Sequence, residues 1–229
     1  LFENAKQILN LGNHPVLLCD NTVYQIVGKK FQSCLTRYGL HILHVSFNGE
    51  ASDNEINRVA ALAEKDGADL VIGLGGGKTI DSAKAIADLL GNPVVIAPTI
   101  ASTDAPTSAL SVIYTEEGAF EKYIFYTKNP DLVLVDSKVI AQAPKRLLAS
   151  GIADGLATWV EARAVMQANG ETMLGQRQTL AGAAIAQKCE ETLFADGLQA
   201  LAACEAQVVT PALEHIIEAN TLLSGVGFE

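Results

Sequence analysis

A glycine-rich run at residues 72–79, IGLGGGKT, carries the most specific local signal for binding chemistry in the sequence. It follows an apolar run typical of a buried strand and precedes a segment with helical spacing. Glycines at such a turn let the backbone approach a ligand closely, and the first turn of the helix presents free N–H groups to an anion. The run differs from the P-loop, which needs glycine at position 72, and from the Rossmann fingerprint, which needs glycine at position 78. It predicts phosphate or pyrophosphate binding, with a tightly packed turn as the alternative, and the residues concerned are Gly75, Gly76, Gly77 and Lys78.

A second polar run, APTIASTDAP at residues 97–106, directly follows another apolar segment. Ligands of open α/β sheets lie beyond the carboxyl ends of the strands. Thr99, Ser102 and Asp104 are therefore expected to line the same crevice as the glycine run. The alternative is a polar turn held by its own Ser, Thr and Asp side chains.

Two further carboxylates stand at positions where they could bind a ligand. Asp20 follows the first predicted strand, where a carboxylate can accept hydrogen bonds from a ribose or can cap the next helix. Asp154 is expected near the start of a helix, where it would stabilise the helix terminus or would bind a metal or substrate.

The histidines do not supply the three protein ligands that a catalytic zinc requires. His41 and His44 are three residues apart on a predicted strand, so their side chains should point to opposite faces. His14 precedes a proline in a turn, and His215 is expected on a solvated helix face. No Gly-x-Ser-x-Gly motif is present, which argues against a serine hydrolase.

The elements that must position these residues alternate between strands and helices in the first half of the chain. This alternation predicts an α/β fold with a mostly parallel sheet, and the continuously apolar strands predict helices on both faces. A small hairpin is expected from residues 111–114 and 122–125. The predicted strands are 15–19, 41–45, 69–72, 94–97 and 132–135, and the predicted helices are 2–10, 22–38, 53–66 and 79–90.

The strand pattern stops near residue 143. Residues 154–168, 172–194 and 197–223 are rich in alanine and predict helices. We therefore expect an α/β domain at residues 1–143 and an all-helical domain at residues 144–229.

Composition narrows the classes of partner and compartment. The 229 residues carry 26 acidic and 16 basic side chains, with no basic run, which argues against a nucleic-acid partner. No apolar run reaches the roughly 18 residues of a transmembrane helix, and no signal peptide is recognisable. The four cysteines form no CxxC pair, so we expect reduced, buried thiols in a cytoplasmic protein. The missing initial Met and the abrupt end suggest part of a longer chain.

The whole chain resembles the glycerol dehydrogenase family of the metal-dependent (iron/zinc, type III) alcohol dehydrogenase superfamily. The resemblance rests on GLGGGKTID at 73–81, APTIASTDAP at 97–106 and SGIADGLATW at 150–159, supported by SALSVIY at 108–114 and EANTLLSGVGFE at 218–229. It implies a Rossmann-like NAD-binding domain followed by the first part of a helical domain, in a dehydroquinate-synthase-like architecture. It also implies NAD-dependent oxidation of glycerol to dihydroxyacetone by a cytoplasmic homo-oligomer without a nucleic-acid or membrane partner. A bound zinc would polarise the substrate hydroxyl.

The resemblance assigns roles residue by residue. Asp20 would meet the nucleotide ribose, Gly77 and Lys78 the pyrophosphate, Asp104 the glycerol, and Asp154 the zinc. The other two zinc ligands of the family are histidines that would follow Glu229, so the chain as given is expected to be inactive alone. Further NAD contacts are expected at Thr99, Ser102, Ser108, Leu110 and Tyr114.

Two alternatives remain open from the sequence. Glycerol-1-phosphate dehydrogenases and dehydroquinate synthases share the glycine run, but a phosphate substrate would call for more basic residues than 99–114 contains. A non-catalytic dinucleotide-binding module would explain the absence of the two histidines.

Overall fold

The computed structural model describes the backbone of residues 5–227 and the side chains of residues 7–227. Within this range the chain divides into two compact units. The first comprises residues up to 99 together with 109–136, and the second comprises 100–108 together with residues from 137 onward. The domain limits expected from the sequence, 1–143 and 144–229, stay a prediction.

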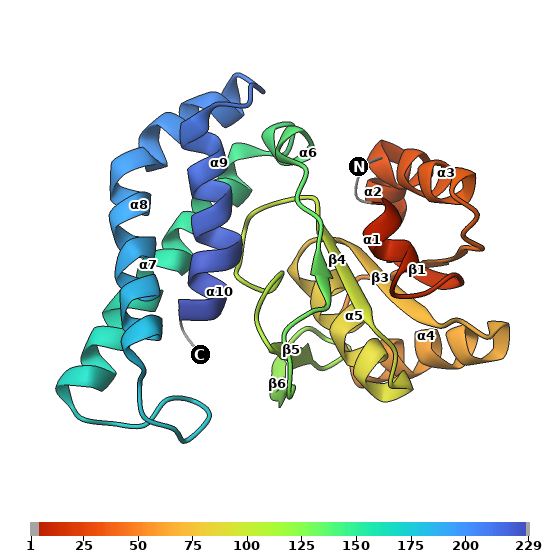
Figure 1. Ribbon diagram of the computed structural model, residues 1–229, viewed down its shortest axis with the longest axis horizontal. Coiled ribbons are helices and arrows are strands. Elements are labelled where there is room, and N and C mark those ends of the chain that lie inside the picture. The colour runs from red at the N-terminus through yellow and green to blue at the C-terminus, as the bar shows by residue number, and fades with distance from the viewer. Residues whose placement is uncertain (1–4, 228–229) are drawn as a thin grey trace. The chain divides into compact units, whose positions relative to one another are not determined.

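A five-stranded parallel sheet forms the centre of the first unit (Figure 1). Its order is β2-β1-β3-β4-β7. Leu17 of β1 pairs with Ile72 of β3, and Gly73 of β3 pairs with Ile96 of β4. The strands are β1 (Pro15–Cys19), β2 (Leu43–Ser46), β3 (Leu70–Gly75), β4 (Val94–Pro98) and β7 (Leu132–Val133).

Helices cover both faces of this sheet, as the apolar strands predict. On one face, Ile8 of α1 (Ala5–Leu9) and Phe31 of α3 (Lys29–Arg37) join Leu17 and Ile72 in a buried cluster. On the other face, α5 (Gly77–Leu90) lies so close to β3 that a Cβ at Gly73 would come 2.6 Å from the Cβ of Ala83. Helix α4 (Asp53–Asp66) lies beside α5 (Figure 1).

The chain between β1 and α3 is helical, but it does not form the single regular helix expected at 22–38. A short helix α2 (Asn21–Val23) leads into a π-helical turn η1 (Tyr24–Gly28) before α3 begins. Strand β2 begins at Leu43, so His41 lies outside it and the expected opposition of His41 and His44 across one strand is wrong. His44 instead stacks on Tyr24, with ring centroids 3.8 Å apart.

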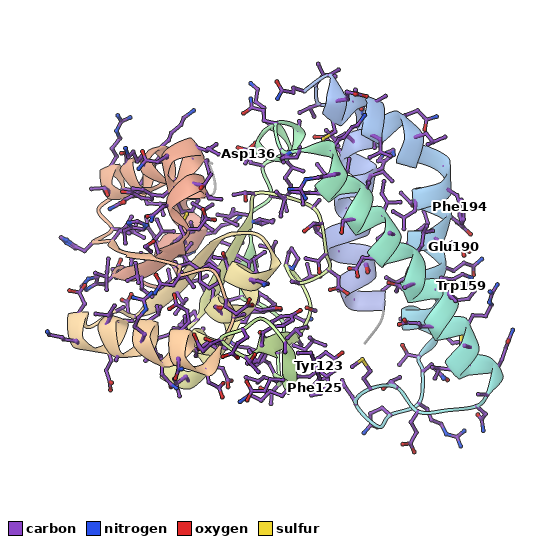
Figure 2. All side chains as sticks on the ribbon, turned by 180° about the vertical axis from the view of Figure 1, so that it is seen from behind. Tyr123, Phe125, Asp136, Trp159, Glu190 and Phe194 are labelled. Atoms are coloured by element: carbon purple, nitrogen blue, oxygen red, sulfur yellow. The ribbon has the colours of Figure 1, made fainter. Side chains whose placement is uncertain are left out.

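A separate antiparallel hairpin completes the first unit, at the position that the sequence predicts. Strands β5 (Leu110–Tyr114) and β6 (Phe120–Phe125) are joined by a turn with Gly118 at φ 82°. A positive φ of this size favours glycine because it lacks a Cβ. Tyr123 and Phe125 lie close together on this hairpin, with ring centroids 6.2 Å apart (Figure 2).

The second unit is helical. Its core includes Leu148, Cys189, Leu193, Leu213 and Ile216. Trp159 and Phe194 lie on its two longest helices, α7 and α8 (Figure 2). The helices are α6 (Ser137–Ala141), α7 (Lys145–Gln167), α8 (Leu180–Glu205), α9 (Pro211–Glu218), a π-helical turn η2 (Ala219–Leu223) and α10 (Ser224–Gly227).

The helix limits predicted for this half of the chain were wrong. Helix α7 begins at Lys145 rather than 154, α8 begins at Leu180 rather than 172, and residues 206–210 interrupt the helix expected at 197–223. The signals that begin two of these helices are threonine caps: Thr179 accepts a hydrogen bond from Gly182 N, and Thr210 accepts one from Leu213 N. In an alanine-rich stretch these caps decide where helices start more than periodicity does. Over residues 5–227, no helix combines the length and the apolar character needed to cross a membrane.

Candidate functional site

The carboxyl edge of the parallel sheet gathers the glycine run and two of the predicted polar residues. The strand order changes direction between β1 and β3, which is the point where open α/β sheets bind ligands. Asp20 directly follows β1, and Gly75 ends β3. Thr99 directly follows β4, and its backbone N–H donates to the Gly75 carbonyl at 3.0 Å. Asp20, Gly75 and Thr99 therefore share one edge, whereas Ser102 and Asp104, which the sequence also predicts beside the glycine run, belong to the second unit.

The glycine run opens α5 without any side-chain cap. Gly76 is the N-cap and makes no side-chain hydrogen bond to the helix, so the first backbone N–H groups of α5 are not occupied by a cap. The backbone at Gly75 is also closely packed, because a Cβ there would come 2.9 Å from Thr79 Oγ1. A 14-residue helix that begins in this way attracts an anion through its dipole and its free donors.

Asp20 caps the helix that follows β1. Its Oδ1 accepts from the backbone N–H of Thr22 at 2.8 Å and of Val23 at 2.9 Å. The capping alternative considered from the sequence is therefore realised. Because both bonds go to one oxygen, capping is compatible with a second role for Oδ2.

Lys78 lies in the first turn of α5 and contacts two partners from other elements. Its Nζ is 2.7 Å from Glu50 Oε2 and 5.2 Å from the ring centroid of Tyr114. Glu50 was not identified from the sequence. Its position shortly after β2 could have indicated that Glu50 lies near the glycine run, because β2 ends at the same edge of the sheet.

In the second unit, the segment 100–108 carries Asp104 beside Asp154 of α7. The Asp154 carboxylate accepts hydrogen bonds from the Asp104 backbone N–H and the Thr103 hydroxyl. Partial burial of this carboxyl raises the pKa of Asp154, Glu161 adds to the increase, and the two hydrogen bonds oppose it. Asp154 lies well inside α7, which begins at Lys145, so the interpretation of Asp154 as a charge at a helix N-terminus is wrong.

Close packing holds the 100–108 segment against the helices of the same unit. Asn220 of η2 is buried, and its Nδ2 donates to the Ala101 carbonyl at 2.9 Å. The Thr107 hydroxyl donates to the Thr221 carbonyl at 2.6 Å. A Cβ at Gly151 would come only 2.1 Å from the Ala101 oxygen. Asn220 is a second site-supporting residue that local sequence patterns did not single out.

The described residues do not assemble a metal site by themselves. Within residues 5–227 no group of three or more His, Cys, Asp or Glu side chains could hold a metal ion. The Asp154 carboxylate can serve as one oxygen ligand of zinc. A zinc site that includes it needs ligands beyond those described.

The parallel five-stranded sheet with helices on both faces defines an α/β protein, and its carboxyl edge is where ligands of such open sheets bind. The family model "Iron-containing alcohol dehydrogenase" matches residues 1–137, and the chain belongs to that family. The relationship to glycerol dehydrogenases expected from the three sequence runs is confirmed.

Individual relatives agree with this assignment. The chain is 50% identical to the glycerol dehydrogenase of Citrobacter freundii over 96% of its own length and 60% of that protein. It is 51% identical to the glycolaldehyde reductase of Halobacterium salinarum, again over 96% of its own length and 60% of that protein. The crystal structure of glycerol dehydrogenase from Schizosaccharomyces pombe matches 100% of the chain and 58% of that structure, with 41% identity and a TM-score of 0.92. The chain thus spans about 60% of the length of these relatives.

Proposed function

We propose that the chain is part of an enzyme that oxidises glycerol to dihydroxyacetone with NAD. In this reaction a hydride leaves the carbon that bears the hydroxyl and passes to NAD, and the hydroxyl proton is released. The observation that carries the proposal is the convergence of Asp104 and Asp154, which are 50 positions apart in the sequence but share a hydrogen bond in one unit. The identity to glycerol dehydrogenases supports the choice of substrate.

The proposed NAD site uses the carboxyl edge of the first unit. The N-terminus of α5, with Gly75, Gly76 and Gly77, binds the pyrophosphate, and Lys78 neutralises part of its charge. Asp20 accepts from ribose hydroxyls through Oδ2. The NAD contacts proposed at Thr99, Leu110 and Tyr114 belong to the same unit, whereas those at Ser102 and Ser108 lie in the second unit.

Asp104 and Asp154 are the proposed catalytic carboxylates. Asp104 binds glycerol, and Asp154 is a zinc ligand, with two histidines expected in the part of the relatives' length that this chain does not span. When bound, zinc lowers the pKa of the hydroxyl that it polarises. The Thr103 and Asp104 hydrogen bonds fix the orientation of the Asp154 carboxylate. We further propose a cytoplasmic homo-oligomer.

A second candidate reaction is the reduction of glycolaldehyde. It is favoured by the 51% identity to a glycolaldehyde reductase. In glycerol oxidation a hydride passes to NAD, and in glycolaldehyde reduction a hydride passes from NADH to the aldehyde carbon. In both reactions the reacting carbon is bonded to a carbon that bears a hydroxyl, so the same residues would serve either reaction. The ratio of kcat/KM for glycerol to that for glycolaldehyde decides between the two reactions.

The test uses the full-length protein that contains this chain, with intact mass and zinc content measured on one sample. We expect one zinc per chain and NAD-dependent glycerol oxidation. Asp154→Asn should reduce zinc content and lower kcat by about 100-fold or more, because charge stabilisation at the developing alkoxide is a large contribution. The NAD dissociation constant should change less than about threefold, since Asp154 lies outside the proposed NAD site.

Glu205→Gln provides the matched control, because it is another acid-to-amide change in the same unit, at an exposed residue at the end of α8 that does not influence the pKa of Asp154. This variant should retain zinc and activity. Full zinc occupancy in Asp154→Asn would refute the ligand assignment. A wild-type protein that binds NAD but neither oxidises glycerol nor reduces glycolaldehyde would support the non-catalytic alternative.

A further inference from the structure

Two oppositely charged side chains are buried in the middle of α5, one turn after the glycine run. Lys84 is 3% exposed and Asp81 is 6% exposed, and Lys84 Nζ lies 3.0 Å from Asp81 Oδ1. Removing two charges from water costs about as much as their attraction returns, so such a pair adds little net stability. It can, however, fix one arrangement of the elements that surround it.

The hydrogen-bond partners of this pair come from strand β5. Lys84 Nζ donates to the Leu110 carbonyl, and the Val112 backbone N–H donates to Asp81 Oδ2 at 3.2 Å. The hydroxyl of Ser111, the residue between them, donates to the Asp81 backbone carbonyl at 2.9 Å. Three consecutive residues of β5 are therefore attached to one turn of α5.

A fourth hydrogen bond connects the residue directly after β6 to β5. Tyr126 directly follows β6, and its hydroxyl donates to Ser111 Oγ at 2.8 Å. Within residues 5–227, β5 and β6 form their own two-stranded sheet and do not pair with the five-stranded sheet. The side chains of α5 therefore replace the strand pairing that would otherwise hold the hairpin. A second anchor lies near the turn, where Lys122 Nζ is 2.6 Å from Asp53 Oδ2.

The same helix presents the proposed pyrophosphate site. Its first residues are Gly77 and Lys78, and Lys78 Nζ lies 5.2 Å from the ring of Tyr114, the last residue of β5. Leu110 and Tyr114, at the two ends of β5, are proposed NAD contacts. A displacement of β5 along α5 would move both contacts relative to the helix N-terminus.

We infer that Asp81 and Lys84 are positioning residues that hold the β5–β6 hairpin in register with the glycine run for NAD binding. Neither residue is proposed to touch NAD. The functional part of this inference rests on the proposed NAD site, whereas the attachment of the hairpin does not.

The test compares Lys84→Met, Asp81→Asn and the double variant Asp81→Asn/Lys84→Met in the full-length protein. Each single variant leaves one buried charge unpaired and should lower stability, and the double variant should recover most of that loss. The double variant keeps an acceptor for Val112 N–H but loses the Lys84 bond to Leu110. We therefore expect its KM for NAD to stay raised about tenfold, which corresponds to about 1.4 kcal/mol, with kcat and zinc content close to wild type.

Amide hydrogen exchange measures the attachment without reference to NAD. Peptides from residues 110–126 should exchange about tenfold faster or more in the double variant, while peptides from β1 and β3 should be unchanged. Lys128→Met is the matched control, since Lys128 and Asp131 form an exposed ion pair with the same three-residue spacing. It should change neither the exchange rate nor KM.

The outcomes separate the two proposals. If the double variant recovers stability, hairpin protection and KM together, the pair has only a structural role and the inference is overturned. Unchanged hairpin exchange in the double variant would overturn it as well. If the wild-type protein does not bind NAD, the proposed function fails, and faster hairpin exchange would then support the attachment but overturn its role in NAD binding.

Discussion

At the scale of single residues, Asp20 combines an observed role in capping a helix with a proposed role in binding the NAD ribose. Its Oδ1 caps α2 through two backbone N–H groups. The group stands at the carboxyl end of β1, on the edge where the NAD site is proposed, and there its carboxylate would accept from ribose hydroxyls and repel a 2′-phosphate. The capping bonds also orient the side chain, because they restrict its rotamer.

Replacing Asp20 with Ser separates these roles, because Ser is also a good N-cap. We expect Asp20→Ser to keep the stability of the chain within about 1 kcal/mol. The ratio of kcat/KM for NAD to that for NADP should fall by about tenfold or more in the full-length enzyme, since the repulsion of the 2′-phosphate is removed.

The control is Asp66→Ser, which removes the same charge from the last residue of α4, where Asp66 pairs with His14 at 2.8 Å. It should leave the cofactor ratio unchanged. An unchanged ratio in Asp20→Ser as well would show that Asp20 faces away from the ribose.

At the scale of elements, the approach of the 100–108 segment to α7 depends on a glycine. A Cβ at Gly151 would lie 2.1 Å from the Ala101 oxygen and 2.4 Å from Asn220 Nδ2. The backbone atom cannot rotate away, so a larger residue would push the segment off the helix. Since Asp104 lies on that segment and Asp154 lies on α7, this contact supports the hydrogen bond from the Asp104 backbone to the Asp154 carboxylate.

Gly151→Ala should therefore destabilise the chain by about 3 kcal/mol, at the upper end of the cost of overpacking a core. Gly197→Ala is the matched control, because it is also a buried helical glycine but its Cβ would meet Ile152 Cδ1 at an ordinary 3.7 Å. This control should be neutral or stabilising by up to about 1 kcal/mol, from the better helix propensity of alanine. Urea unfolding with an unchanged m-value measures both, and equal midpoints for the two variants would contradict the packing argument.

At the scale of the whole molecule, the four cysteines are free and buried, two in each unit. Burial raises the pKa of Cys19 to about 12, and the neighbouring Asp20 adds to the increase. Burial likewise raises the pKa of Cys189 to about 11, with contributions from Asp104 and Asp154. Because the thiolate is the reactive form, both groups should react poorly in the folded protein.

Thiol titration of this chain with a chromogenic disulfide should consequently show no fast-reacting group under native conditions at pH 8. In urea, all four thiols should react, in agreement with the four cysteines of the sequence. Fast labelling of the folded chain would indicate an exposed thiol, and fewer than four reactive groups after unfolding would indicate a disulfide. Either result would contradict the expected state of these side chains.

The sequence by itself determined the α/β layout of the first unit and the edge that carries the glycine run. The reason is that parallel strands joined by helices must all end at one edge, so Asp20, Gly75 and Thr99 could be placed together from their positions after three apolar runs. The motifs also determined the family, because their order and spacing extend over the whole chain.

Only the tertiary structure decided which distant residues support the site. Asn220 reaches Ala101 across 119 positions, Lys78 pairs with Glu50, and Lys84 holds Leu110. These contacts arise from how finished elements pack, and no periodicity within a local window encodes them. The helix limits of the second unit were decided in the same way, because an alanine-rich segment is favourable to a helix almost everywhere and caps and packing select where each helix begins.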